Sequence, residues 1–585
     1  MSVHHKDLNK QQIKAVETDG NVLITACPGS GKTRVITHKL AYELQRMSDS
    51  KRLIIALTYT NRAADEIKRR VEKFDISTSN LWTGTIHSFC LEWILKPYMG
   101  YLSELKNGFA IIDEFESDEL ISELKDKHCI YKYASIKRVY NLDGGFNTND
   151  SRYLPLIQEY KETIQKKKKI DFDDILYYSY KLIIKFPIIS VRLSNLFSLL
   201  CVDEYQDTQE LQYSILAEIV KANDNKTKIF FVGDICQAIY GSIGGIAKNK
   251  NEISKQFGGI TIEPLELSGN YRSNQRVIDY YSNYQVENLR IAAVSSIAVN
   301  RGVISYDTET HLDNIHEVVS KLIRNTINKG IAPSEICVMA PQWWMILPMG
   351  RKLKSLLPDI DFDAFGLSPF RRIRDNIWYK VIKLFLSKPY NSNYTIRYQW
   401  ALELLIALDE IIPDFLLGIS NRKRFLLRAI NHFSTNQKDS LLFIEEALKY
   451  FLWVFSISIE NFPLLNDKRE IFIRVVAREL EKEEFDYASD VNTLIRVFNT
   501  KSGVVVSTCH GVKGEEYETV IAFGLLDGYI PNWNDEDKMA ANKLLYVMCS
   551  RAKNNLYLFS EQGHKTKLGP RAPTGVLAGI PYSYD

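Results

Sequence analysis

Residues 22–33 read VLITACPGSGKT, and this stretch decides the fold of the chain around it. Its first four residues form an apolar run that predicts a strand, and a helical pattern begins at Lys32. The small residues between them let backbone N–H groups turn toward phosphates, and the N-terminus of the helix adds its positive end. The stretch therefore predicts a phosphate-binding loop between a strand and a helix, although Ala26 stands where the usual pattern has its first glycine.

Two residues of the predicted loop carry specific chemistry. Lys32 is expected to reach the β- and γ-phosphates of a nucleotide, and Thr33 is expected to bind Mg²⁺. The residues expected to surround the phosphates are Ala26, Cys27, Pro28, Gly29, Ser30, Gly31, Lys32 and Thr33. A chance Gly-Ser-Gly-Lys-Thr turn is the alternative, and an acidic segment further along the chain argues against it.

That acidic segment follows an apolar run at residues 196–202 and begins with Asp203 and Glu204. Ligands of parallel α/β sheets bind at the carboxyl ends of the strands. Asp203 is therefore predicted to hold Mg²⁺, and Glu204 to orient and deprotonate the attacking water. The nucleotide is expected to be ATP rather than GTP, because the chain contains no Asn-Lys-x-Asp motif that would bind guanine.

Strand-like runs followed by turns and helical patterns recur along the chain. They lie at residues 21–26, 53–58, 196–202, 229–233, 336–340, 503–508 and 519–523. This alternation predicts an α/β fold, with a parallel sheet covered by helices on both faces. Residues 91–185 and 376–500 are instead rich in Leu, Ile, Lys, Glu and aromatic residues at helical spacing. Helical insertions are favoured over appended helical domains, because sheet-type segments resume after each stretch.

The composition excludes several classes of protein. Of 585 residues, 45% are hydrophobic and 25% charged, which is ordinary for a globular chain. The formal charge of +3 is too balanced for a polybasic protein, so any nucleic-acid surface must be local. The eight cysteines include no CxxC pair, which argues against a zinc ribbon and fits a reducing compartment. A signal peptide and a membrane span are not indicated, and a cytoplasmic location is expected.

The order of short motifs along the chain resembles that of the UvrD/Rep/PcrA group of superfamily 1A DNA helicases, from about residue 8 to about residue 560. The matching segments are residues 8–12, 26–33, 58–64, 85–88, 170–175, 202–208, 232–240, 270–273, 508–517 and 546–552. So many motifs in the family's order are not expected by chance. The resemblance implies two RecA-like motor domains of the P-loop NTPase type, each with a helical inserted subdomain.

The same resemblance implies domain boundaries. By analogy, the first motor spans residues 1–90 and 190–270, with a helical insertion at 91–189, and the second spans 271–375 and 501–585, with an insertion at 376–500. ATP and Mg²⁺ would bind in the cleft between the motors. A nuclease domain fused to the second motor is not expected, because only 34 residues follow Arg551.

The resemblance also assigns residues around the nucleotide. Gln12 would bind the adenine, and Arg34 and Tyr271 would stack on its two faces. Gln237 corresponds to the residue that senses the γ-phosphate, and Glu516 to a contact near the nucleotide.

Two arginines, Arg272 and Arg551, resemble the fingers that reach the nucleotide from the second motor. Each would offset negative charge on the γ-phosphoryl group as it leaves. The alternative for both is an ordinary structural arginine that bridges carboxylates.

On the DNA side, the resemblance points to positions that contact a single strand. They are Tyr59, Thr60, Asn61, Thr85, His87, Tyr240 and His510. Tyr59 replaces a phenylalanine that stacks on a base in relatives, and capping or core hydrogen bonding is the alternative for Thr85 and the two histidines. The lysine run 166–169 could contact duplex DNA, although a solvated helix face is favoured.

The chain also departs from the family. Ser242 and Ile243 stand where relatives carry an aromatic platform and an arginine, which predicts weak unwinding by the chain alone. The leading interpretation is an ATP-dependent DNA helicase, a single-strand-stimulated ATPase that moves 3′ to 5′ along single-stranded DNA and separates duplex, in DNA repair or in defence against phage. The alternative is an ATP-dependent DNA-sensing regulatory subunit that activates a separate nuclease partner.

Overall fold

The computed structural model describes residues 7–47, 51–112, 114–222, 226–241, 244–363, 370, 373, 376–387, 389, 394–413, 415, 422–481, 490–491, 494–495, 502–532, 537–566 and 569–585. The chain forms two compact units. The first comprises Met1–Ile112, Ile121–Asp313 and Cys509–Asp585, and the second comprises Asp113–Leu120 and Asn314–Thr508. The predicted division into two motors and two insertions is finer than this, and it stays a prediction.

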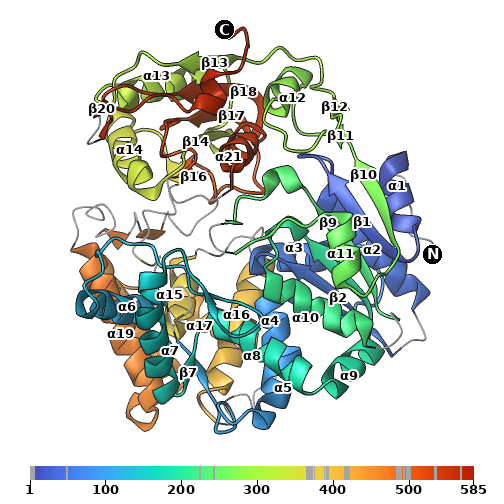
Figure 1. Cartoon of the computed structure of the whole chain (residues 1–585). Coiled ribbons are helices and arrows are strands. Elements are labelled where there is room, and N and C mark those ends of the chain that lie inside the picture. Colours follow the sequence, from blue (N-terminus) through green and yellow to red (C-terminus); the bar gives the residue numbers. More distant parts are fainter. Residues whose placement is uncertain are drawn as a thin grey trace. The chain divides into compact units, whose positions relative to one another are not determined.

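The first unit is built on a six-stranded parallel sheet (Figure 1). Its strands, in spatial order, are β10 (Ile262–Leu267), β1 (Asn21–Ala26), β9 (Lys228–Gly233), β8 (Phe197–Asp203), β2 (Leu53–Thr58) and β3 (Leu81–Thr85). The strands predicted at residues 21–26, 53–58, 196–202 and 229–233 are thus present, with ends that differ by no more than one residue. The α/β fold class is confirmed.

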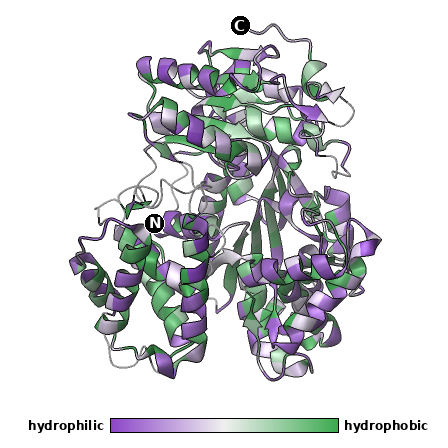
Figure 2. Ribbon diagram, turned by 90° about the vertical axis from the view of Figure 1, so that its left-hand side faces the viewer, coloured by the Kyte–Doolittle hydropathy of each residue, from purple (hydrophilic) through white to green (hydrophobic). Residues whose placement is uncertain are grey.

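Both faces of this sheet are buried. In β1, Val22 and Ile24 pack toward helices α1 (Lys10–Glu17), α2 (Lys32–Arg46) and α3 (Asn61–Glu72). Leu23 points to the opposite face, which helices α8 (Phe172–Lys185) and α10 (Glu210–Lys221) cover. Successive side chains of a strand alternate between faces, so a strand buried on both reads as a continuous apolar run. In Figure 2 the strands are accordingly mostly green, whereas the helices carry green and purple stripes.

The first helical insertion shares its core with the sheet. Its buried residues Leu102, Tyr140 and Ile175 belong to the same cluster as Leu23 of β1. Helix α7 (Leu154–Lys166) carries the buried Lys161, which meets the start of α8. The insertion therefore packs directly on one face of the six-stranded sheet.

The start of α8 explains the family-like signature at residues 170–175. Asp171 caps the helix through the N–H of Asp174, and the Asp174 carboxylate accepts the N–H of Asp171 in return. Lys161 Nζ lies 2.7 Å from Asp171 Oδ1 and 2.8 Å from Asp174 Oδ1, and the Tyr140 hydroxyl donates to Asp174 Oδ1. Asp171 and Asp174 of the signature thus hold the first turn of the helix to the rest of the insertion.

A further set of parallel strands lies in the first unit, in the order β13 (Ile304–Asp307), β18 (Ala552–Phe559) and β17 (Tyr517–Ala522). Helices α12 (Gln275–Ser282) and α21 (Ala540–Cys549) pack against each other and against β18. Residues 270–273, 509–517 and 546–552, which lie in three of the segments that resemble helicase motifs, border these elements and belong to the same unit as the phosphate loop.

The second unit contains parallel strands in the order β14 (Ile336–Ala340), β16 (Val504–Thr508) and β15 (Phe362–Asp363). Helices α13 (Ile315–Asn328) and α14 (Trp343–Leu356) belong to the same unit. The helices predicted for the second insertion are present as α15 (Ile377–Leu386), α16 (Tyr394–Asp409), α17 (Arg422–His432), α18 (Ser440–Val454) and α19 (Pro463–Leu480). Trp378 lies fully buried at their centre and donates its Nε1–H to the Leu465 carbonyl over 3.0 Å.

The eight cysteines all lie in the described part of the chain, where none forms a disulfide; seven are buried and Cys129 is exposed. Burial raises the pKa of the Cys27, Cys90 and Cys509 thiols to about 12. No helix within the described ranges has the length and apolar character needed to cross a membrane.

Candidate nucleotide and DNA site

The sequence-predicted site residues gather at one edge of the first sheet. The phosphate loop follows β1, Asp203 ends β8 with Glu204 directly after it, and Gln237 follows β9. Tyr59 comes directly after β2, and Thr85 ends β3. Because all these strands are parallel, their carboxyl ends meet at the same edge, which is where α/β proteins bind their ligands.

The backbone of the phosphate loop requires its glycines. Gly29 has φ 69° and Gly31 φ 81°, in the left-handed region that other residues avoid. A Cβ on Gly29 would lie 2.6 Å from the Cβ of Arg272, so a side chain there would also displace that residue. The Asn270 side-chain amide donates to the Pro28 carbonyl over 2.8 Å. The segment 270–272 therefore packs directly against the loop.

The residues predicted to contact adenine meet around the N-terminal segment. Gln12 Nε2 donates to the Ser30 carbonyl over 2.9 Å, and the Tyr271 hydroxyl accepts from Asn9 Nδ2 over 2.8 Å. Arg34 Nη1 donates to the backbone carbonyl of Asp7 over 3.3 Å. Residues 7–12 thus join Gln12, Arg34 and Tyr271 to the edge of the phosphate loop.

Lys32 and Glu204 form an ion pair in this structure. Lys32 Nζ lies 2.8 Å from both carboxylate oxygens of Glu204, and Gln206 Nε2 donates to Glu204 Oε2 over 2.6 Å. Burial alone would raise the pKa of the Glu204 carboxyl, but the charges of Lys32 and then Lys513 outweigh it and lower the pKa to about 2. Glu204 also holds a positive φ of 53°, which costs about 1–3 kcal/mol in a residue other than glycine. Phosphates that bind in the loop must compete with Glu204 for Lys32.

Asp203 has the environment of a cation ligand. Burial first, and then the charge of Glu204, raise the pKa of its carboxyl to about 7. Its Oδ1 is buried and has no hydrogen-bond partner among the described residues. A buried carboxylate oxygen without a donor is stabilised by a metal ion, so Asp203 fits the predicted Mg²⁺ role. Within the described ranges no cluster of three His, Cys, Asp or Glu could hold a metal, so Thr33, water and phosphates would supply its other ligands.

Arg551 is fully buried and makes hydrogen bonds only to neutral groups. Its Nη2 donates to Gln237 Oε1 over 2.9 Å, and its Nη1 to the Glu515 carbonyl over 3.2 Å. Burial first, and the charge of Arg272 second, lower the pKa of Arg551 to about 9, so the side chain stays charged at neutral pH. A buried cation without a carboxylate partner among the described residues is suited to an incoming anion.

Arg272 differs from Arg551 in its partners. Its Nε donates to Glu516 Oε2 over 2.8 Å, and its Nη1 donates to the Ser550 carbonyl over 2.9 Å. The structure thus brings together Arg272 and Glu516, both predicted near the nucleotide, as an ion pair beside the phosphate loop.

Lys513 is a residue whose role the sequence reasoning missed. Its Nζ donates to Asp207 Oδ2 over 2.5 Å and to the Gln237 carbonyl over 2.7 Å, and it lies 4.7 Å from the centre of the Tyr240 ring. It therefore touches the acidic segment, the predicted γ-phosphate sensor segment and a predicted DNA residue at once. The only sequence signal was its place inside the motif at residues 508–517.

Three predicted DNA residues form an aromatic cluster, in which Tyr59 and Tyr240 stack and His510 is tilted against Tyr240. The Tyr59 and Tyr240 rings lie 4.6 Å apart with an angle of 20° between their planes. The His510 ring lies 5.6 Å from that of Tyr240, and His510 Nε2 lies 3.3 Å from the Ile239 carbonyl. Tyr59 is 42% exposed, so one end of the stack is open to a base.

The remaining predicted DNA residues also have local structural roles. Thr85 caps helix α4 (Ile86–Phe89) through its hydroxyl oxygen, as the capping alternative expects, and Thr60 caps helix α3 in the same way. Asn61 is exposed in the first turn of α3. Burial lowers the pKa of His87 to about 4, so its ring is neutral at physiological pH.

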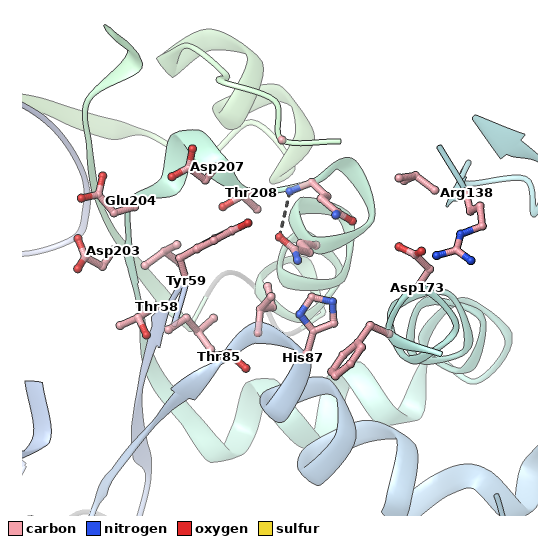
Figure 3. Close-up of a pocket in the computed structure, with 18 of the residues that line it drawn as sticks. Thr58, Tyr59, Thr85, His87, Arg138, Asp173, Asp203, Glu204, Asp207 and Thr208 are labelled. Carbon is pink, nitrogen blue, oxygen red and sulfur yellow. Dashed lines mark hydrogen bonds between the residues drawn. The ribbon is translucent and has the colours of Figure 1, made fainter. Parts of the chain in front are cut away.

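A cavity of about 460 Å³ is lined both by residues predicted for the nucleotide site and by residues predicted to contact DNA (Figure 3). At one side it is lined by Asp203, Glu204 and Tyr59, and at the other by Arg138 and Asp173 of the first insertion. Thr85 and His87 also line this cavity.

Two further sequence predictions concern the pair Ser242 and Ile243 and the lysine run 166–169. Ser242 and Ile243 lie outside the described residues. Residues 166–168 of the lysine run are exposed at and just beyond the end of α7, as a solvated helix face requires.

Comparison with known proteins gives a consistent family. The UvrD/REP helicase N-terminal domain family matches residues 8–258, and the UvrD-like helicase C-terminal domain family matches residues 477–563. A protein described as a probable DNA helicase II homolog, from Mycoplasma capricolum subsp. capricolum, is 26% identical over 95% of this chain and 84% of its own length. Tyr271 and Arg272 fall between the two matched ranges, so their position rests on the geometry above.

Two further relatives have similar coverage. The ATP-dependent DNA helicase PcrA of Staphylococcus epidermidis is 26% identical over 94% of this chain and 83% of its own length. The ATP-dependent DNA helicase PcrA of Staphylococcus aureus is 24% identical over the same shares, 94% and 83%.

Proposed function

The chain belongs to the UvrD/Rep family of DNA helicases, and from that membership we propose that it hydrolyses ATP to move 3′ to 5′ along single-stranded DNA. Its ATPase would be stimulated by that DNA. The observation that carries the proposal is the position of Lys513, which touches both the nucleotide side and the aromatic cluster of the DNA side.

The nucleotide half of the mechanism follows from two pairs of residues. When ATP binds, its phosphates draw Lys32 away from Glu204 and leave that carboxylate free to take a proton from the attacking water. Arg551 and Arg272 would stabilise the negative charge that develops on the γ-phosphoryl oxygens. Mg²⁺, held by Thr33 and Asp203, would supply further positive charge to the β- and γ-phosphates.

The DNA half of the mechanism rests on base stacking and on the contacts of Lys513. A base of the single strand would stack on Tyr59, whose other face meets Tyr240. Any movement of Gln237 on binding a γ-phosphate would reach Tyr240 through Lys513, since Lys513 bonds to the Gln237 carbonyl and lies over the Tyr240 ring. Hydrolysis and the grip on DNA would thereby be coupled.

An ATPase assay with and without single-stranded DNA tests the proposal, alongside strand displacement on duplexes with either a 3′ or a 5′ single-stranded tail. DNA-stimulated turnover and preferential opening of the 3′-tailed duplex are expected. Turnover that does not respond to DNA would contradict it.

Stimulated turnover without strand displacement would instead favour the alternative, a DNA sensor that acts on a separate nuclease. A role in DNA repair or in defence against phage is proposed from the family resemblance alone. Co-purification of this chain from its own cells would identify a partner.

A further inference from the structure

Two tyrosines of the first insertion project into solvent. Tyr131 is 71% exposed and Tyr133 is 76% exposed, and their rings meet edge to face with centroids 5.5 Å apart. Other tyrosines of the same insertion are buried, among them Tyr140 at 8% and Tyr160 at 0%. Large apolar surface in water is unfavourable by about 25 cal/mol per Å², so an exposed aromatic pair points to a partner.

The segment that carries this pair is a fixed turn. The N–H of Ala134 donates to the Tyr131 carbonyl over 2.8 Å, and Lys125 Nζ donates to the Lys132 carbonyl over 3.1 Å. We call residues 130–134 the tyrosine turn. Its two rings are therefore presented to solvent by a defined backbone.

The chain after the turn is fixed as well. Asn149 Nδ2 donates to the Ser135 carbonyl over 2.9 Å, and Asn149 Oδ1 accepts the N–H of Lys137 over 3.2 Å. These two bonds bridge Asn149 to both sides of residue 136. Hydrogen bonds thus hold the backbone both in the turn and in the residues that follow it.

The segment that carries the tyrosine turn is rich in cationic side chains. Residues 125–138 contain five lysine and arginine residues and a single acidic one, Asp126. Lys127 is neutralised by Glu159, but among the described residues Lys132, Lys137 and Arg138 form no ion pair with a carboxylate. Exposed aromatic rings among cations are the arrangement that binds single-stranded nucleic acid, through stacked bases and phosphate contacts.

The tyrosine turn is continuous with the cavity of the candidate site. Residues 135–139 line that cavity, and Figure 3 places Arg138 on the side away from Asp203 and Glu204. Arg138 Nη1 is buried there without a hydrogen-bond partner in the described structure. A strand that passes through the cavity past Arg138 would reach Lys132 and the two tyrosines next.

We propose that the tyrosine turn is a second single-strand site, on which bases of the DNA strand leaving the cavity stack against Tyr131 and Tyr133. Lys132 and Lys137 contact the phosphates of the same nucleotides. This assignment rests on the proposed DNA translocase function, and it extends the strand's path beyond the motor sheet onto the first insertion. The occupant is unpaired DNA, because only unstacked bases offer free faces to two rings.

The test uses the full-length chain and oligo(dT) strands of increasing length, with affinity measured by fluorescence anisotropy. For the wild type, affinity is expected to rise with length until a strand covers both the cavity and the turn. In the variant Tyr131→Ser/Tyr133→Ser, the shortest strands should bind as in the wild type, and long strands about ten-fold more weakly. Tyr131→Phe/Tyr133→Phe should restore the wild-type curve, since stacking needs the ring and not the hydroxyl.

A matched control is available in the same insertion. Tyr101 is 57% exposed and does not line the cavity, so Tyr101→Ser should bind strands of every length like the wild type. The proposal would be overturned if the double serine variant bound strands of every length as tightly as the wild type does. A loss that is equal for short and long strands, or one seen only with blunt duplexes, would overturn it too. A wild type that binds no strand at all would instead contradict the proposed function itself.

Discussion

At the scale of single residues, the ion pair between Lys32 and Glu204 has a consequence for nucleotide affinity. Replacing Glu204 with Gln removes the base, so hydrolysis should stop. Because the amide no longer holds Lys32 as an ion pair, ATP should bind at least as tightly as in the wild type, and up to about ten-fold more tightly. Titration with a fluorescent ATP analogue, beside a turnover assay, measures both quantities.

The matching variant is Lys32→Ala, which should abolish both tight binding and turnover because the loop loses its cation. If Glu204→Gln lowered affinity and turnover together, Glu204 would be a structural residue of its strained turn and not the base.

His87 allows a test with pH. Its pKa is about 4 in the folded chain because of burial, against an ordinary 6.5. Between these values the unfolded chain binds a proton that the folded chain does not, so stability should fall as pH drops from 6.5 toward 4. We expect the wild type to lose about 1–2 kcal/mol more than His87→Gln between pH 7 and pH 5, after allowance for the partial exposure of the ring.

Urea unfolding at the two pH values gives the comparison. Since the His87 ring is neutral throughout pH 6–8, the ratio of DNA affinities of the wild type and His87→Gln should stay constant in that range. A ratio that rises toward pH 6 would mean that a charged His87 contacts phosphate.

At the scale of elements, α7 and the start of α8 depend on Lys161. Lys161→Met would leave Asp171 and Asp174 buried without their cation, at a cost of about 3–5 kcal/mol. The first turn of α8 carries Phe172 and Asp173, which line the cavity, so DNA stimulation of the ATPase should be lost before basal turnover. Turnover with and without single-stranded DNA, beside a thermal melt, measures the effect.

Two variants control for this. Lys166→Met changes an exposed lysine of the same helix and should alter neither the DNA stimulation of turnover nor the thermal stability. The triple variant Lys161→Met/Asp171→Asn/Asp174→Asn removes all three charges and should recover part of the stability. Loss of basal turnover to the same degree as stimulation would show that the damage is not confined to the insertion.

At the scale of the whole molecule, the residues predicted to bind the nucleotide are shared unequally between the two units. The phosphate loop, Glu204, Gln237, Arg272 and Arg551 all belong to the first unit. Calorimetric unfolding is expected in two steps, and Mg-ATP at about one hundred times its Kd should stabilise only the first unit's step, by about 2.7 kcal/mol. Equal shifts of both steps would mean that the second unit also binds the nucleotide.

Much of this molecule could be predicted from local sequence. The strand, loop and helix at residues 21–46 were predictable because an apolar run, left-handed glycines and a helical pattern follow one another directly. The α/β class and most motor strands were predictable for the same reason.

The remainder depends on contacts between distant segments. Lys513 meets Asp207 across 306 residues of chain, and no local pattern states that contact. Nor does the sequence reveal that Arg551 donates hydrogen bonds only to uncharged acceptors. That depends on how far the fold places it from the carboxylates of other segments. In the run Ile130–Ala134, alternation alone does not tell which side chains face water.

The distribution of thiols has a practical consequence for optical measurements. Seven cysteines are enclosed in packed interior, and Cys129, next to the tyrosine turn, is the one that solvent reaches among the eight, all of which are described. A maleimide dye should therefore attach to the unmodified chain at one position, without engineering of any residue. If a strand binds at the neighbouring rings as proposed, the emission of the dye should change when it arrives or leaves, so the native sequence already contains the attachment point for a real-time reporter of that binding.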